Sequence, residues 1–119
     1  MAKGLGDCYV VAARLITSAE FLTDPTARLV HGTVERRSDG LRHSHAWIET
    51  SQTFENDAWP HPITMITCID RSNGLDMALP GELFYKVGRV SDVTRYTPVE
   101  AMKEMLRTGQ YGPWDTCVS

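Results

Sequence analysis

The sequence lacks a long hydrophobic run, a paired set of cysteines and an excess of basic residues. No window approaches the roughly 20 apolar residues that a membrane-spanning helix requires, and the first residues have no apolar stretch of signal-peptide length. Lysine and arginine number 12 against 15 acidic residues, and the resulting net charge of −3 argues against a dedicated nucleic-acid-binding protein. We therefore expect a protein of the cytoplasm that has neither a membrane nor a nucleic acid as partner.

The cysteines are Cys8, Cys68 and Cys117. An odd number without CxxC spacing indicates neither a disulfide framework nor a structural zinc site. We expect no metal and no cofactor. One of the three cysteines is instead a candidate for a reactive thiol.

The 119 residues suffice for one domain with one core, so we expect a single domain over residues 1–119. At its start, apolar residues recur at helical spacing from Cys8 to about Leu22, and Asp7 stands at the N-cap position. Residues 23–25 (TDP) are typical of a helix end. The spacing therefore predicts one helix that begins with a cysteine.

The next segments have the composition of strands. The runs 29–35 and 43–50 flank a polar turn that contains Gly40, which predicts an antiparallel hairpin. The run 63–69, rich in isoleucine and threonine, predicts a central strand that ends before Asp70. We expect residues 51–62 to form a loop with a short strand around Phe54.

The last third of the chain predicts two helices. Pro80 can open a helix that extends to about Val87, and a short strand is expected at residues 93–96. Thr97 and Glu100 form a capping-box pattern for a helix that stops at Gly109, and its apolar stripe is expected to be core: Met102, Met105 and Leu106. We expect the tail 111–115 to fold back on the domain. The fold class is α+β, with the cysteine-bearing helix packed on a small antiparallel sheet.

Cys8 stands where a glycine-bearing segment meets the predicted helix. The partial positive charge at a helix N-terminus stabilises a thiolate, and the exposed amides there can bind an oxyanion. The neighbouring Asp7 disfavours a thiolate unless its carboxylate caps the helix. The alternative interpretation is that Cys8 is a small buried apolar residue.

Two further elements complete a candidate site. On a strand, His45, Trp47 and Glu49 share one face, and an imidazole held beside an aromatic ring is a candidate general base. Asp70, at the end of the next apolar strand, could accept a hydrogen bond from the imidazole and orient it. As alternatives, the histidine is structural and the aspartate only initiates a turn.

The order of these elements resembles the papain-like cysteine hydrolases, most closely their transglutaminase-like branch. Residues 6–9 (GDCY) are similar to the nucleophile motif of that branch, residues 45–49 (HAWIE) to its histidine strand, and residues 68–70 (CID) more loosely to its aspartate strand. The resemblance covers about residues 4–74. From residue 75 onward the chain is similar only to small uncharacterised proteins from phages of actinobacteria, which themselves look papain-like.

The resemblance implies Cys8 as nucleophile, His45 as general base and acid, and Asp70 as the orienting acid. The neighbouring candidates for substrate or oxyanion contacts are Gly6, Asp7, Tyr9, Trp47 and Asn73. Two features depart from the family pattern. Ala2 stands where papain relatives place a glutamine, which leaves the second oxyanion donor unassigned, and the long interval between His45 and Asp70 leaves Asn73 as an alternative third member.

We therefore expect a cysteine-dependent peptidase, amidase, deamidase or acyltransferase that acts on a protein or peptide-like amide. If the protein is phage-encoded, the substrate could be a host protein and the site of action the host cytoplasm. The alternatives are a non-catalytic phage protein that binds a host factor and a metal site built on His43, His45, His31 and Cys68. The sequence does not indicate the oligomeric state.

Overall fold

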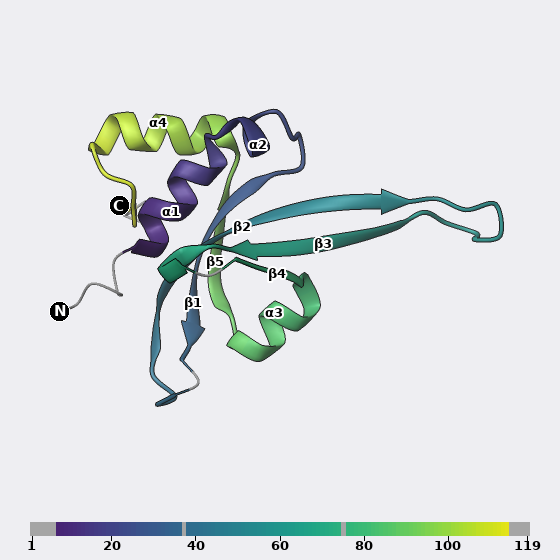
Figure 1. The fold of residues 1–119 in the computed structure, drawn as a ribbon, viewed down its shortest axis with the longest axis horizontal. Helices are drawn as coiled ribbons and strands as arrows, with labels where there is room; N and C mark the ends of the chain where they lie inside the picture. The colour runs from purple at the N-terminus through teal and green to yellow at the C-terminus, as the bar shows by residue number, and fades with distance from the viewer. Residues whose placement is uncertain (1–6, 37, 75, 115–119) are drawn as a thin grey trace.

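A computed structural model describes residues 7–36, 38–74 and 76–114 of the chain. In this part of the chain, a five-stranded antiparallel sheet of order β4-β3-β2-β1-β5 packs against helices on both faces. Figure 1 shows α1, α2 and α4 gathered on one side of the sheet and α3 on the other. The predicted α+β class is confirmed.

The N-terminal helix α1 (Asp7–Ile16) carries Cys8 in its first turn, as predicted. The prediction of one helix up to Leu22 is wrong, because a short second helix, α2 (Ala19–Leu22), follows after a break. At the break the Thr17 and Ser18 hydroxyls donate to the carbonyl oxygens of residues 13 and 15, at 3.1 and 2.6 Å. Such side-chain bonds compete with helix continuation.

Strands β1 (Arg28–Glu35) and β2 (Arg42–Phe54) form the predicted antiparallel hairpin. Strand β2 pairs with β3 (Ile63–Asp70) from Ile48 opposite Ile69 to Phe54 opposite Ile63. The predicted loop is therefore shorter than expected and covers residues 55–62. Figure 1 shows the two paired strands projecting far from the rest of the molecule. We call residues 51–54 and 63–66 the β2–β3 arm.

The second half of the chain completes the sheet. A 3₁₀ turn at Ser72–Gly74 leads into β4 (Met77–Pro80), which the sequence analysis did not predict. Pro80 therefore ends a strand and precedes α3 (Gly81–Gly88) instead of opening it. Strand β5 (Ser91–Tyr96) pairs with β1.

The last helix, α4 (Pro98–Thr108), confirms the capping box. The Thr97 side chain accepts from the Glu100 amide at 3.1 Å, and the Glu100 carboxylate accepts from the Thr97 amide at 2.9 Å. The helix ends at Gly109, whose φ of 72° suits a residue without a side chain. None of the helices in the described part of the chain has the length and apolarity needed to span a membrane.

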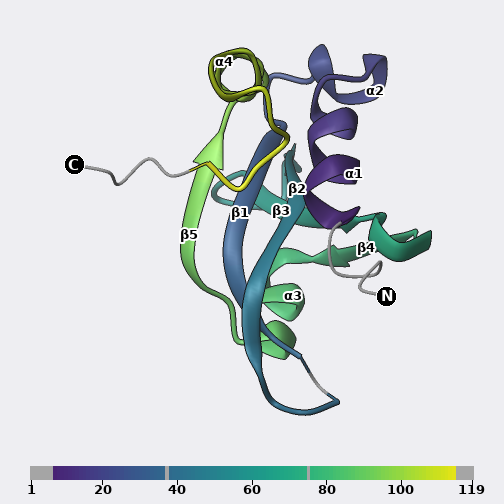
Figure 2. The ribbon, with the colours of Figure 1, turned by 90° about the vertical axis from the view of Figure 1, so that its left-hand side faces the viewer.

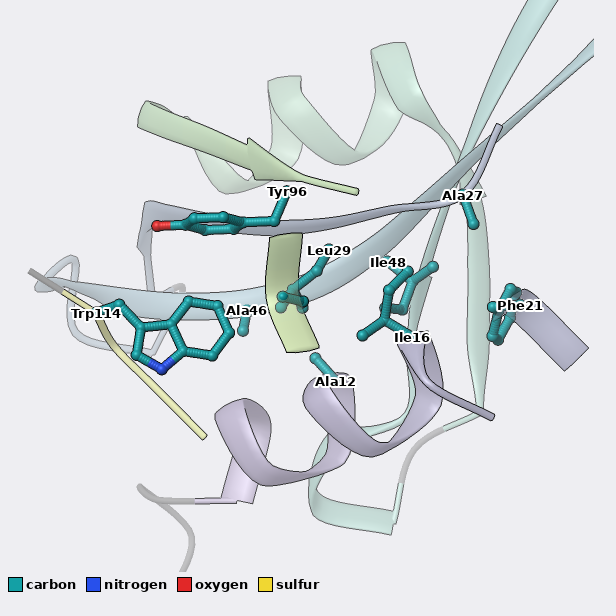
Figure 3. Close-up of a cluster of buried hydrophobic side chains, with 10 residues drawn as sticks. Ala12, Ile16, Phe21, Ala27, Leu29, Ala46, Ile48, Tyr96 and Trp114 are labelled. Atoms are coloured by element: carbon teal, nitrogen blue, oxygen red, sulfur yellow. The ribbon is translucent and has the colours of Figure 1, made fainter. Parts of the chain in front are cut away.

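Two hydrophobic cores lie on the two faces of the sheet. Figure 3 shows the core on the α1 side, where side chains of α1 and the C-terminal segment meet those of β1 and β2: Ala12, Ile16, Leu29, Ala46, Ile48 and Trp114 among them. A second core beneath α3 contains Val30, Val34, Trp47, Cys68 and Phe84. Figure 2 shows α4 and α1 on the opposite side of the sheet from α3.

Two predictions about the C-terminal region have different outcomes. Trp114 is buried in the α1-side core, so the part of the tail that is described does fold back. The predicted core stripe of α4 is wrong in part. Met105 packs against the core, but Met102 is half-exposed and Leu106 is exposed, because the small Ala101 is the residue that faces the sheet.

Candidate active site

The thiol of Cys8 lies at the start of α1, where the sequence predicted it. The residue is buried, with an exposed fraction of 6%. Helix α1 is held in place by Ala12 and Ile16, which pack on Ala46 and Ile48 of β2. The first turn of a helix has amides without partners inside the helix, so the position of Cys8 supplies donors for an anion next to the sulfur.

His45 lies on β2 and shares a strand face with Trp47 and Glu49. Its register partner is Gly32 of β1. A Cβ atom at Gly32 would come within 2.8 Å of the Trp47 ring, so the glycine leaves the space that this indole needs. The rings of Trp47 and His45 are stacked, with centroids 6.0 Å apart. The imidazole is thus held by packing, and its side chain is 14% exposed.

Asp70 is the last residue of β3 and lies one step beyond the pair formed by Ile48 and Ile69. This register places it opposite Trp47 and diagonally across from His45. Nε2 of His45 donates to Oδ2 of Asp70 at 2.7 Å. The structure thus brings together the two residues that the sequence analysis paired across an interval of 25 residues.

Ser72 fixes the second oxygen of Asp70, a contact that the sequence analysis missed. Its amide and its hydroxyl both donate to Oδ1 of Asp70, at 3.0 and 2.6 Å. Ser72 is almost fully buried. An aspartate followed two residues later by a serine is a common turn pattern, so the signal was present in the sequence but was interpreted only as a turn.

The charges of the site favour an ion pair. Burial alone would lower the pKa of His45, but its interactions with Asp70 and with Cys8 outweigh burial and raise this pKa to about 9. Burial opposes ionisation of Asp70, whereas its bonds with His45 and Ser72 lower the pKa of the carboxyl below its usual value. At neutral pH the site therefore holds an aspartate and an imidazolium beside Cys8.

A cationic imidazole next to a sulfur stabilises a thiolate. The other described cysteine, Cys68, has the opposite environment. Burial, together with the nearby Glu49 carboxylate, raises the pKa of Cys68 to about 12. Cys68 therefore stays a thiol at neutral pH, and the two buried cysteines differ in their expected chemistry. Cys117 lies outside the described residues.

Glu49 explains the last position of the HAWIE motif. It is buried beneath α3, and its Oε2 accepts from the Trp47 indole at 3.1 Å and from the Tyr85 hydroxyl. Oε1 accepts from Nε of Arg95 at 3.0 Å. The carboxylate thus anchors the indole that stacks on His45. The sequence placed Glu49 on the correct face but gave no sign of its partners in α3 and β5.

Two hollows lie near the site. A narrow crevice is lined by Cys8 and other residues of α1, by Ala46 and Trp47 of β2 and by the end of β3. A wider, open pocket of about 610 Å³ adjoins the site, lined by the residue after Cys8, the residue before His45 and the C-terminal segment: Tyr9, Val10, Ser44 and residues 109–113. The described residues that line this pocket include no charged one.

The remaining candidates are placed as follows. Asp7 is the first residue of α1, and Tyr9 packs edge-on against His31. Gly6 and the side chain of Asn73 lie outside the described part of the chain, so neither contact is assigned.

The histidines do not form the metal set that the sequence left as an alternative. His31 faces α1, on the opposite side of the sheet from His45. In the described part of the chain, no three His, Cys, Asp or Glu side chains are grouped so that they could hold a metal ion.

Comparisons with known proteins found no match, either among models of protein families, among curated proteins or among solved structures. The papain-like resemblance therefore stays a prediction from the sequence motifs.

Proposed function

We propose that the protein is a cysteine-dependent acyl-group hydrolase or acyltransferase with Cys8, His45 and Asp70 as its catalytic residues. The observation that carries the proposal is the 2.7 Å bond between His45 and Asp70 beside a cysteine at a helix N-terminus. This arrangement has the three parts that thiol catalysis requires: a nucleophile, a base next to it and a group that orients the base.

The chemistry follows from the charges. The Cys8 thiolate attacks the carbonyl carbon of an amide or ester and forms a carbon–sulfur bond, while the carbonyl π electrons move to oxygen. In this proposal, amides at the start of α1 stabilise the oxyanion. When the oxyanion collapses, the bond to the leaving group breaks and imidazolium His45 supplies its proton. The product is a thioester on Cys8 and a released amine or alcohol.

The second half restores the enzyme. Water or an amine loses a proton to neutral His45 and attacks the thioester carbon. The carbon–sulfur bond breaks, the thiolate returns and the imidazolium is formed again. Because Nε2 of His45 is committed to Asp70, the nitrogen that exchanges protons in both halves is Nδ1. The sequence resemblance suggests a protein or peptide-like amide as the substrate.

The test is the rate at which an uncharged alkylating agent such as iodoacetamide modifies each cysteine at pH 7, followed by mass spectrometry. Replacing Cys117 with serine restricts the comparison to Cys8 and Cys68. We expect Cys8 to react much faster, because it is next to an imidazolium and Cys68 is next to a carboxylate.

His45→Ala should slow the modification of Cys8. His43→Ala is the matched control, because His43 lies two residues away on the same strand face, with the ring centroids 5.9 Å apart. Equal and slow modification of both cysteines in the folded protein would contradict the proposal. That result would favour the alternative of a non-catalytic binding protein.

A further inference from the structure

The β2–β3 arm leaves half of a strand edge uncovered. Strand β4 pairs with β3 only from residue 67 to residue 70. Beyond Pro80 the chain turns into α3, so no strand in the described part of the chain pairs with the outer edge of residues 63–66. The backbone amide and carbonyl groups along such an edge can pair with another strand.

Half of the side chains of the arm are apolar, and these apolar side chains are exposed. Ile63, Met65 and Ile66 have exposed fractions of 46, 50 and 46%, and Phe54 at the end of β2 has 39%. An isolated two-stranded ribbon is at best marginally stable in water. The arm therefore presents apolar surface on a part of the fold that gains little stability from its own contacts.

The arm also lacks the residues that normally prevent strand pairing. Exposed edge strands commonly carry lysine, proline or another charge that blocks association. Residues 50–54 (TSQTF) and 63–68 (ITMITC) contain no charged residue, although 23% of the whole chain is charged. An uncharged strand is not repelled by an identical strand. It has no charged side chain that could form an ion pair with a strongly charged partner.

A pocket of about 630 Å³ lies along the same edge. It is lined by the uncovered residues of β3, by the start of α3 and by Glu49, Tyr85 and Arg95. A strand added at this edge would continue the line of β4 and would place alternate side chains over this pocket.

We propose that the occupant of this edge is a second copy of the chain, so that residues 63–66 of two protomers pair antiparallel about a twofold axis. Residues directly opposite each other in an antiparallel sheet point to the same face, so the twofold axis lies at a residue and not between two residues. Within residues 63–66 that residue is Thr64 or Met65. With the axis at Thr64, Met65 lies opposite Ile63 of the partner subunit; with the axis at Met65, it lies opposite Met65 of the partner subunit. The contact is isologous, and the two sheets become one continuous sheet.

Sedimentation equilibrium of the full chain across the micromolar range tests this proposal. We expect a monomer–dimer equilibrium, with Met65→Lys weakening the dimer about tenfold or more, since each protomer contributes the substituted residue to the interface. The half-exposed position lets the variant fold, which circular dichroism checks. The matched control is Gln52→Lys, because Gln52 is the register partner of Met65 on the inner strand of the arm and should leave the dimer intact.

Hydrogen exchange gives a second measurement on the unmodified protein. Edge pairing predicts that the amides of residues 63–66 that point to the outer edge become protected as the concentration rises, whereas those of residues 50–54 do not change. A wild-type monomer over the whole range, or equal weakening by Met65→Lys and Gln52→Lys, would overturn the edge-paired dimer.

Discussion

The ion pair at the candidate site predicts a specific loss of stability at alkaline pH. The pKa of His45 is raised from 6.5 to about 9 in the folded protein, so the folded state holds this proton more tightly than the unfolded chain does. The stabilisation is fully present below about pH 6.5 and is lost as the pH rises through about 9. A difference of about 2.5 between the two pKa values corresponds to at most about 3.4 kcal/mol of unfolding free energy.

The assay is urea unfolding of the wild type and of His45→Gln at pH 6 and at pH 9.5. Other groups titrate in this range, so the informative quantity is the change with pH in the difference between the two proteins. Between pH 6 and pH 9.5 we expect the unfolding free energy of the wild type to fall by about 2 to 3 kcal/mol more than that of the variant. The difference is smaller than the upper limit of about 3.4 kcal/mol because the imidazole is partly exposed to solvent.

Cys8→Ala separates the contributions of the two partners. It removes the sulfur but keeps Asp70. The loss of unfolding free energy at alkaline pH that is due to His45 should therefore become smaller but not disappear. If wild type and His45→Gln respond identically to pH, His45 is not held as an imidazolium, and the proposed thiolate–imidazolium pair is refuted.

Two further substitutions test the surroundings of the site. Burial lowers the pKa of His31 from 6.5 to about 4 in the folded protein, so between these pH values the unfolded chain binds a proton that the folded protein does not. The free energy of unfolding should therefore fall as the pH drops from 6.5 to about 4. His31→Leu should remove this dependence in urea titrations at acid pH. Ser72→Ala removes the 2.6 Å bond to Asp70, which should cost about 1.5 to 3 kcal/mol. It should also raise the pKa of the Asp70 carboxyl in an NMR titration, because this bond stabilises the carboxylate, whereas an unchanged titration would limit Ser72 to a structural role.

Local patterns predicted most elements of the fold. The capping box at Thr97 and the polar hairpin turn after Glu35 depend on neighbouring residues, and both are confirmed. The break at Thr17 and Ser18 was missed because the apolar spacing continues across it. Strand β4 was missed because its four residues form a strand only through pairing with β3, which helical and strand periodicity do not reveal.

The candidate site was predicted from motif order, and its supporting contacts were not. The bond between His45 and Asp70 depends on a register between strands that alternation alone leaves open. Glu49 lies in a network whose partners, Tyr85 and Arg95, are far away in sequence. Such long-range partners are set by the packing of α3 and β5 on the sheet, which no local pattern contains.

The arm also accounts for the long interval between His45 and Asp70. Residues join a hairpin in opposite pairs, so the length of the arm does not change which residues meet at its base. Replacing residues 53–64 with a two-residue Asn-Gly turn should keep Gln52 opposite Met65 and leave the active-site register intact. This shortened chain should retain the fast alkylation of Cys8 and lose dimerisation. Slow alkylation of Cys8 in a folded shortened protein would show that the arm supports the active site. That result would contradict the view that the arm and the active site are independent.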